Sequence, residues 1–184
     1  MTEPPGPARL PEGGDPAIFT PAVDWWNATV AARGRLPARA DLRPEDLGGR
    51  TLPHVLLVDV GDAGKRLRFR VMGSAHVAFN QVDLSGRDFD TIYPEGGTLD
   101  YVRGLYRDMC ATRRPLWSVN EVRHFRTGMP IVLRRLMLPM AADGMVVDMS
   151  LGVQTIHRPP DRGVDALNPW HVARSIIEHD RRFL

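Results

Sequence analysis

The feature that most constrains the fold is a change of residue period at Gly73. The preceding residues 66–72 read RLRFRVM, in which arginines alternate with apolar side chains. This period of two is typical of a strand that buries one face and exposes the other. A short turn at residues 61–65 joins it to the apolar segment HVLLVDV at residues 54–60, so an antiparallel hairpin is predicted. After Gly73, the sequence SAHVAFNQ at residues 74–81 instead predicts a short helix.

A longer helix and three further strands follow this hairpin. Thr98 is a suitable N-cap for a helix that Pro115 ends. Its apolar residues recur with helical spacing at Leu99, Val102, Tyr106 and Met109. Strands are predicted at residues 116–125, 129–140 and 145–157. Together these elements indicate an α+β fold, in which short helices and one longer helix cover one face of a five-stranded antiparallel sheet.

Both ends of the chain are predicted to lie outside this sheet. Residues 1–19 carry many Pro and Gly residues and are expected to form a flexible N-terminal tail. A flanking helix is expected to begin at Thr20 and to belong to the domain, residues 20–157. Residues 158–184 are expected to form a linker and then a C-terminal amphipathic helix that begins after Asn168.

Composition excludes several classes of protein. The chain is 43% hydrophobic and 25% charged, which is typical of a globular domain. No apolar run approaches the ~18 residues that span a bilayer, so membrane insertion is not expected. The single cysteine, Cys110, rules out an internal disulfide framework, and with no signal-peptide core at the N-terminus it favours a cytoplasmic protein. The net charge of +2 is scattered along the chain, so nucleic acid is not an expected partner.

Catalytic and metal-binding patterns are weak in this sequence. No two histidines have the i, i+4 spacing of a helical metal site, so no metal is expected. No nucleophile elbow, phosphate loop or dinucleotide-binding glycine motif occurs. The best enzymatic alternative is an isomerase or dehydratase with a conical α+β barrel, which needs His76 beside Asp83 or Asp88. Turn formation around Gly86 explains those aspartates, so the chain is expected not to be an enzyme.

The order of the predicted elements resembles that of a PAS domain, the sensory α+β module of bacterial signalling proteins. The similarity is to a subgroup of small stand-alone bacterial PAS proteins without a fused effector domain. It covers about residues 22–157, and its central part is RFRVMGSAHVAFNQVDLSGRDF at residues 68–89. Shorter segments that carry it lie at residues 36–41, 52–54, 112–115 and 136–140. In such a domain Gly73 lets the chain leave the second strand sharply, and the next helix walls off an internal cavity.

The resemblance implies a cavity that either binds a small molecule or is filled by side chains. Candidate lining residues come from the two helices and the third strand: His76, Phe79, Asn80, Tyr106, Met109 and Trp117. Arg134 and Arg135 are adjacent in a strand, so one of them points to the cavity side unless that strand edge reaches solvent. Arg134 is taken as the candidate. An inward arginine requires an anionic partner from the protein or from a ligand.

Flavin and haem, two cofactors of PAS domains, are not expected, and the identity of any ligand stays open. A flavin photosensor of this fold needs a reactive cysteine in the short-helix region, where this chain reads AFNQVDLSG. Cys110, on the longer helix, is interpreted as a small core residue. Haem-binding members commonly use a histidine on the long helix. That helix has none here, which leaves His76 as the remaining candidate.

No effector domain is visible in the sequence, so a signal would leave through a surface. Candidate interface residues lie on the two flanking helices: Trp25, Trp26, Trp170, Ile176, Ile177 and Phe183. Trp25 and Trp26 are adjacent, and adjacent helical residues are not expected to face one core. We predict a sensory or regulatory homodimer that binds a small ligand, a signalling protein or both and signals through its flanking helices. The alternative is a constitutive interaction adaptor with a filled core.

Overall fold

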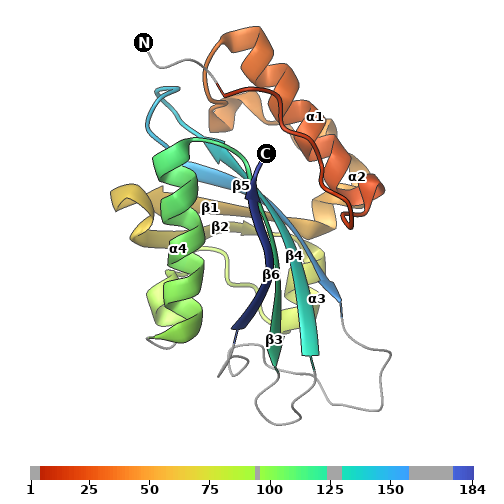
Figure 1. Cartoon of the computed structure of the whole chain (residues 1–184), viewed down its shortest axis with the longest axis vertical. Coiled ribbons are helices and arrows are strands. Elements are labelled where there is room, and N and C mark those ends of the chain that lie inside the picture. The colour runs from red at the N-terminus through yellow and green to blue at the C-terminus, as the bar shows by residue number, and fades with distance from the viewer. Residues whose placement is uncertain (1–4, 94–95, 124–129, 158–175) are drawn as a thin grey trace.

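An antiparallel sheet of six strands forms the centre of the structure (Figure 1). The structure is a computed structural model that describes residues 5–93, 96–123, 130–157 and 176–184. The strand order across the sheet is β2-β1-β5-β4-β3-β6. The strands are β1 Val55–Gly61, β2 Arg66–Met72, β3 Leu116–Arg123, β4 Pro130–Met140, β5 Met149–His157 and β6 Ile176–Phe183. The first five correspond to the predicted strands, and the α+β fold is confirmed.

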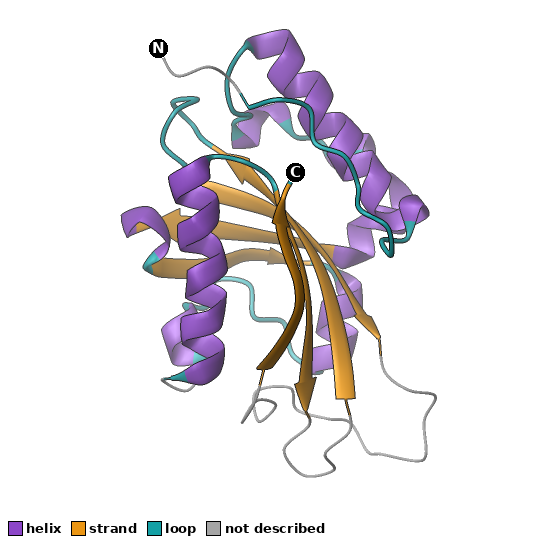
Figure 2. Cartoon of the chain, viewed as in Figure 1, coloured by secondary structure: helices purple, strands orange, loops and turns teal. Residues whose placement is uncertain are grey.

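Helices lie on both faces of this sheet (Figure 2). One face carries α3, the turn η5 and the long α4, while α1 packs on the other face together with α2. The bounds are α1 Pro16–Arg33, α2 Gly48–Thr51, α3 Ser74–Asn80, α4 Gly97–Thr112, and the 3-10 turns η1 Arg39–Asp41, η2 Pro44–Asp46, η3 Leu52–His54, η4 Asp62–Gly64 and η5 Phe89–Thr91. The short helix after the hairpin and the longer helix are confirmed. Among the described residues, no helix combines the length and the apolar character needed to cross a membrane.

The predicted hairpin is confirmed, and a close contact explains the glycine at its end. β1 and β2 pair antiparallel, with Leu56 opposite Met72. Gly73 has a φ of −64°, which any residue adopts. A Cβ atom at this position would lie only 2.4 Å from the carbonyl oxygen of Pro53. Glycine is therefore required by the close approach of the chain before β1, and not by an unusual backbone angle.

The prediction of a C-terminal helix is wrong for the part that the structure describes. Residues 176–183 form the strand β6, which pairs antiparallel with β3 at one edge of the sheet. The sheet therefore has six strands where the sequence predicted five. The rest of the predicted linker and helix, residues 158–175 with Trp170, lies outside the described residues.

Contacts with distant parts of the chain explain why this segment is a strand. β6 satisfies backbone groups of β3 along its whole length. The guanidinium of Arg181 pairs at 2.7 Å with the carboxylate of Asp108 on α4, 73 positions earlier in the sequence. The N–H of Leu184 donates to the carbonyl oxygen of Pro115 at 2.9 Å. Such tertiary contacts override a local helical pattern.

Helix α1 begins at Pro16, earlier than the predicted Thr20. The carboxylate of Asp15 caps it by accepting a hydrogen bond from a backbone N–H of the first turn at 3.0 Å, and Pro16 takes the first helical position. Residues 16–19 therefore belong to the helix and not to a flexible tail. Ala8, ahead of the helix, is also buried.

The expectation that Trp25 and Trp26 cannot both face one core is wrong, because both belong to the same buried cluster. α1 lies between the sheet and residues 36–54, so its two sides face different partners. The indole N–H of Trp26, which is fully buried, donates to the carbonyl oxygen of Pro139 in β4 at 2.9 Å. The indole N–H of Trp25 donates to the carbonyl oxygen of Asp41 at 3.3 Å. Neither tryptophan is available as an exposed interface residue.

Candidate functional site

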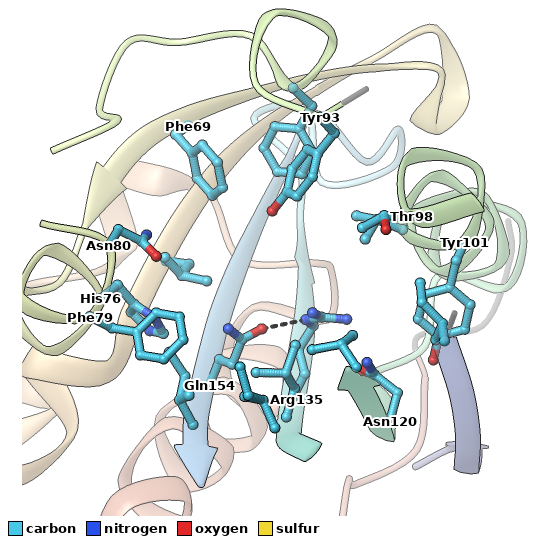
Figure 3. A pocket seen from close by; sticks show the side chains of 18 of the residues that line it. Phe69, His76, Phe79, Asn80, Tyr93, Thr98, Tyr101, Asn120, Arg135 and Gln154 are labelled. Carbon is cyan, nitrogen blue, oxygen red and sulfur yellow. Dashed lines mark hydrogen bonds between the residues drawn. The ribbon is translucent and has the colours of Figure 1, made fainter. Parts of the chain in front are cut away.

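A cavity of about 120 Å³ lies between one face of the sheet and the elements α3, η5 and α4 (Figure 3). A single water needs only ~10–15 Å³ of such space, so this cavity has room for a small organic molecule. Its polar lining residues are His76, Asn80, Tyr93, Thr98, Tyr101, Tyr106, Asn120, Arg135 and Gln154. The remaining lining residues are aromatic or aliphatic, including Phe69, Phe79 and Phe89.

Strand alternation builds the polar floor of the cavity. Arg135 of β4 and Gln154 of β5 are direct cross-strand neighbours, and Nε of Arg135 donates to Oε1 of Gln154 at 2.7 Å. Ser118 of β3 stands opposite Arg135 on its other side. Asn120 follows two residues later on the same face and lines the cavity. Three adjacent strands thus bring one cation and several neutral polar groups together.

Aromatic rings form much of the opposite wall. The rings of Phe69 and Phe89 lie 4.3 Å apart between centroids, and Phe89 meets Tyr106 edge-on at 6.0 Å. Phe89 also contacts Tyr93, with ring centroids 5.5 Å apart. Figure 3 shows the hydroxyl of Tyr93 pointing into the cavity above Arg135. This wall offers apolar contact with polar groups at its margins, as small-molecule sites do.

His76 is a buried, neutral base on the α3 side. Its side chain is 2% exposed, and its Nε2 lies 3.1 Å from the carbonyl oxygen of His54. Burial lowers the pKa of His76 to about 4, although the hydrogen bond to His54 acts in the opposite direction. At neutral pH the imidazole therefore carries no charge, and its Nε2–H donates to that carbonyl.

Two further groups of the α4 side stay protonated at neutral pH. Burial raises the pKa of the Tyr106 phenol well above its usual value, while the positive charge of Arg135 partly opposes this rise. Burial also raises the pKa of the Cys110 thiol to about 11. Neither group supplies a negative charge to balance Arg135.

Several polar atoms on the floor have no hydrogen-bond partner within the described part of the chain. These atoms are Nη1 of Arg135, Oγ of Ser118 and Oδ1 of Asn120, and all three are inaccessible to solvent. Ser118 is fully buried and Asn120 is 1% exposed. Buried polar groups are normally satisfied, so these three atoms are exceptions among the described residues.

The structure brings four of the predicted pocket residues to the cavity: His76, Phe79, Asn80 and Tyr106. Met109 is fully buried beside the cavity floor, where the hydroxyl of Ser150 lies 3.7 Å from its sulfur, and it does not line the cavity. Trp117 packs edge-on against Phe19 of α1, with ring centroids 5.1 Å apart. It therefore lies on the opposite face of the sheet.

Arg135, and not the predicted Arg134, lines the cavity. Arg134 pairs across the strands with Val119 and Thr155, whose side chains belong to the face away from α3 and α4. Alternation alone required the two arginines to point in opposite directions. Which one faces inward depends on the register with Ser118, and that register is not readable from β4 itself.

Sequence reasoning missed most of the other polar lining residues. Gln154 and Asn120 lie in strands that mix apolar and polar residues, so composition alone does not mark them; their alternation with Val153 and Val119 is the signal that could have identified them. Tyr93 and Tyr101 come from a turn and from a helix position outside the apolar stripe, so no pattern marks them.

Asp83 and Asp88, the partners of His76 in the enzymatic alternative, do not line the cavity. The Asp83 carboxylate instead accepts the N–H of Ser85 in a turn at 2.9 Å.

The predicted interface residues separate in the structure. Trp25 and Trp26 are buried, and Ile176 lines the cavity. Ile177 and Phe183 are exposed on β6, with exposed fractions of 44% and 36%. Trp170 lies outside the described residues.

Among the described residues, no three His, Cys, Asp or Glu side chains gather in a way that could hold a metal ion.

In this structure one short helix and one long helix pack on one face of an antiparallel sheet and enclose a cavity. This arrangement is that of a sensory α+β module. A family model described as PAS domain matches residues 18–155, about three quarters of the chain, and the chain belongs to the PAS domain family. Domains of this family are typically sensory or regulatory parts of signalling proteins, and not catalysts. A search of curated proteins finds no significant match.

Proposed function

We propose that this PAS domain is a sensor that binds a small organic molecule in the cavity and signals through protein contacts made by β6. The observation that carries the proposal is the cavity itself. It is lined on one side by aromatic rings and on the other by polar side chains, among them Arg135, Gln154 and Asn120. A constitutive adaptor with a filled core is expected to have apolar side chains in place of this cavity and its polar lining.

The strand β6 links the cavity to the surface. Its first residue, Ile176, lines the cavity, while the next one, Ile177, is exposed. Arg181 pairs with Asp108 of α4 and lies 5.4 Å from the ring centroid of Tyr101, another lining residue. A molecule that moves Tyr101 or Ile176 therefore changes the free energy with which β6 docks, and so shifts the population of docked chains. β6 takes the signalling role that the sequence assigned to a terminal helix.

The surface presented by β6 suits association with another chain. β6 is the last strand in the sheet order, so its outer edge has no strand partner among the described residues. The exposed side chains of Ile177 and Phe183 lie on this strand. We propose a homodimer in which this edge takes part, with a signalling protein as the competing partner.

Native mass spectrometry, compared with the denatured mass of the chain, tests both parts of the proposal. A native mass that exceeds a whole multiple of the chain by the mass of a small molecule supports the sensor. The dimer part predicts a native mass near two chains, and Ile177→Ser should shift it toward one chain. Val71→Ser, on the edge strand β2 at the other end of the sheet, is the matched control because Val71 is similarly exposed. A mass of the bare chain that persists after incubation with small-molecule mixtures contradicts the sensor.

A further inference from the structure

We infer that the ligand of this cavity is a small organic acid, whose carboxylate binds Arg135 and whose body is a single ring or a short apolar chain. The inference rests on the proposed function, because it specifies the class of ligand for the same cavity. Three features of the described residues support it: the charge balance of the floor, the donors that are available there, and the shape of the walls.

The charge of Arg135 is not balanced by the described part of the chain. No carboxylate there forms an ion pair with it, and its hydrogen bond to Gln154 is to a neutral amide. Glu178, which stands opposite Asn120 on β6, is instead paired with Arg181 at 2.7 Å. A guanidinium held in a largely apolar cavity without a counterion is unfavourable. A ligand carboxylate supplies the missing negative charge.

The guanidinium of Arg135 carries the donors that a carboxylate needs. Gln154 accepts the hydrogen bond from Nε of Arg135, so the two terminal nitrogens of the guanidinium remain for a ligand. One of them, Nη1, has no partner among the described residues. The two terminal nitrogens form the edge that binds carboxylates with two hydrogen bonds, and because Nη1 has no accessible surface in the ligand-free structure, such binding requires a small movement of the Arg135 side chain. The hydroxyl of Ser118, opposite Arg135 on the neighbouring strand, also lacks a partner within the described ranges, but it is buried outside the cavity lining and is not counted as a donor to the ligand. The buried Oδ1 of Asn120 accepts a hydrogen bond, so a hydroxyl or amino group close to the carboxylate would complete the site.

The walls limit the rest of the molecule. Opposite the floor lie Phe69, Phe79 and Phe89, and neither an arginine nor a lysine other than Arg135 lines the cavity in the described residues. A second carboxylate or a phosphate would therefore lie against aromatic rings without a countercharge. The volume of about 120 Å³ is suited to one ring and not to a nucleotide. A monoanion with an apolar body satisfies both restrictions.

Pairs of acids and amides of equal size separate charge recognition from simple filling of the cavity. The probes are benzoate with benzamide, phenylacetate with phenylacetamide, and 3-phenylpropionate with 3-phenylpropanamide. Binding to the full chain is followed by two-dimensional amide NMR, which reports both the dissociation constant and whether cavity residues respond. For at least one pair we expect the acid to bind about tenfold or more tightly than the amide, because a hydrogen bond to a charged partner is the stronger kind.

Substitution of the two neighbouring arginines locates the effect. Arg135→Met and Arg135→Gln should reduce the acid-to-amide preference to about one, and Gln keeps a polar group beside Gln154 if Met disturbs the fold. Arg134→Met is the matched control, because it removes the same charge from the same strand on the opposite face. It should leave the preference unchanged.

Each result leads to a different conclusion. If amides bind in the cavity as tightly as acids, or if Arg135→Gln keeps the preference, the organic-acid inference is wrong while the sensor proposal stands. If none of the six probes perturbs the cavity residues, the organic-acid inference fails, and the native mass spectrum decides separately whether the sensor proposal stands. A copurified ligand whose mass identifies a molecule without an acidic group also overturns the inference alone.

Discussion

The two faces of the sheet are built differently, although the same strands supply both. On the α1 face, Trp26 and Trp117 are fully buried, and Trp117 packs edge-on against Phe19. On the α3 and α4 face, Arg135 and Gln154 lie at the floor of an open cavity. The first face is filled by buried side chains, whereas the second encloses a cavity.

This difference separates stability from recognition within a single layer of strands. Because side chains alternate, Trp117 and Ser118 are neighbours in sequence and yet serve opposite faces. The filled face can hold the sheet together whatever occupies the cavity. The other face can then carry polar side chains around a cavity.

Truncation of aromatic residues on the two faces should give the largest contrast. Trp117→Ala should lower the free energy of unfolding by about 3–5 kcal/mol, because it leaves a large void under α1. Phe79→Ala, at the cavity and only partly buried, should cost about 1 kcal/mol, since less apolar surface is removed from water at this position than at Trp117. Urea unfolding of both variants measures the difference. Equal losses would mean that the cavity face is packed as tightly as the other.

The junction where the chain passes from the hairpin to the cavity wall should be nearly as sensitive. Gly73→Ala places a Cβ 2.4 Å from the carbonyl oxygen of Pro53, and the backbone shift should cost about 3 kcal/mol. Gly104→Ala in α4 is the control, since no atom lies within 4 Å of the added Cβ. It should stabilise the protein by about 1 kcal/mol through helix propensity. Thermal and urea unfolding report both, and a neutral Gly73→Ala would refute the steric argument.

The cavity face should also make stability depend on pH. His76 stays neutral in the folded protein until its pKa of about 4, whereas the unfolded chain takes up the proton near pH 6.5. The unfolded state therefore binds more protons in between, and stability falls by about 2 kcal/mol as the pH drops from about 7.5 to 5. Urea midpoints across this range should be flatter for His76→Gln than for the native chain. An unchanged slope in His76→Gln would contradict the assignment.

The smallest effect should come from the two arginines in the absence of ligand. Arg135→Met should raise the free energy of unfolding by about 1 kcal/mol, because it removes a charge without a counterion from the cavity. Arg134→Met, on the other face, should change stability by less than about 0.5 kcal/mol. Melting temperatures of the ligand-free variants make the comparison. A loss of stability in Arg135→Met would indicate that the charge is compensated after all.

The local order of elements was predictable from the sequence. The alternation of residues 66–72, the break at Gly73 and the helical stripe of α4 each depend on neighbouring residues, and each appears in the structure. The candidate site was predictable to the extent that it depends on such elements. His76 and Phe79 come from the short helix that the break predicts.

The remaining features depend on contacts between distant residues. The segment 176–183 forms a strand because it pairs with β3 and because its Arg181 forms an ion pair with Asp108. Trp25 is buried because residues 36–54 fold back over α1. The inward direction of Arg135 follows from its register with Ser118. None of these contacts leaves a periodic pattern in its own segment.

The pairing of β1 with β5 determines when the cavity can form during folding. Val58 of β1 stands opposite Ser150 of β5, roughly 90 residues later in the chain. The other pairings, β1 with β2 and β3 with β4 and then β5, join strands that are consecutive in the sequence, so they close shorter loops. His76 comes from the first of these units, and Gln154 comes from the second. The cavity therefore exists only after the two units have joined, in the step with the greatest loss of chain entropy. A ligand that recognises only the joined state should slow unfolding and leave the folding rate almost unchanged, so that occupancy lengthens the lifetime of the native protein.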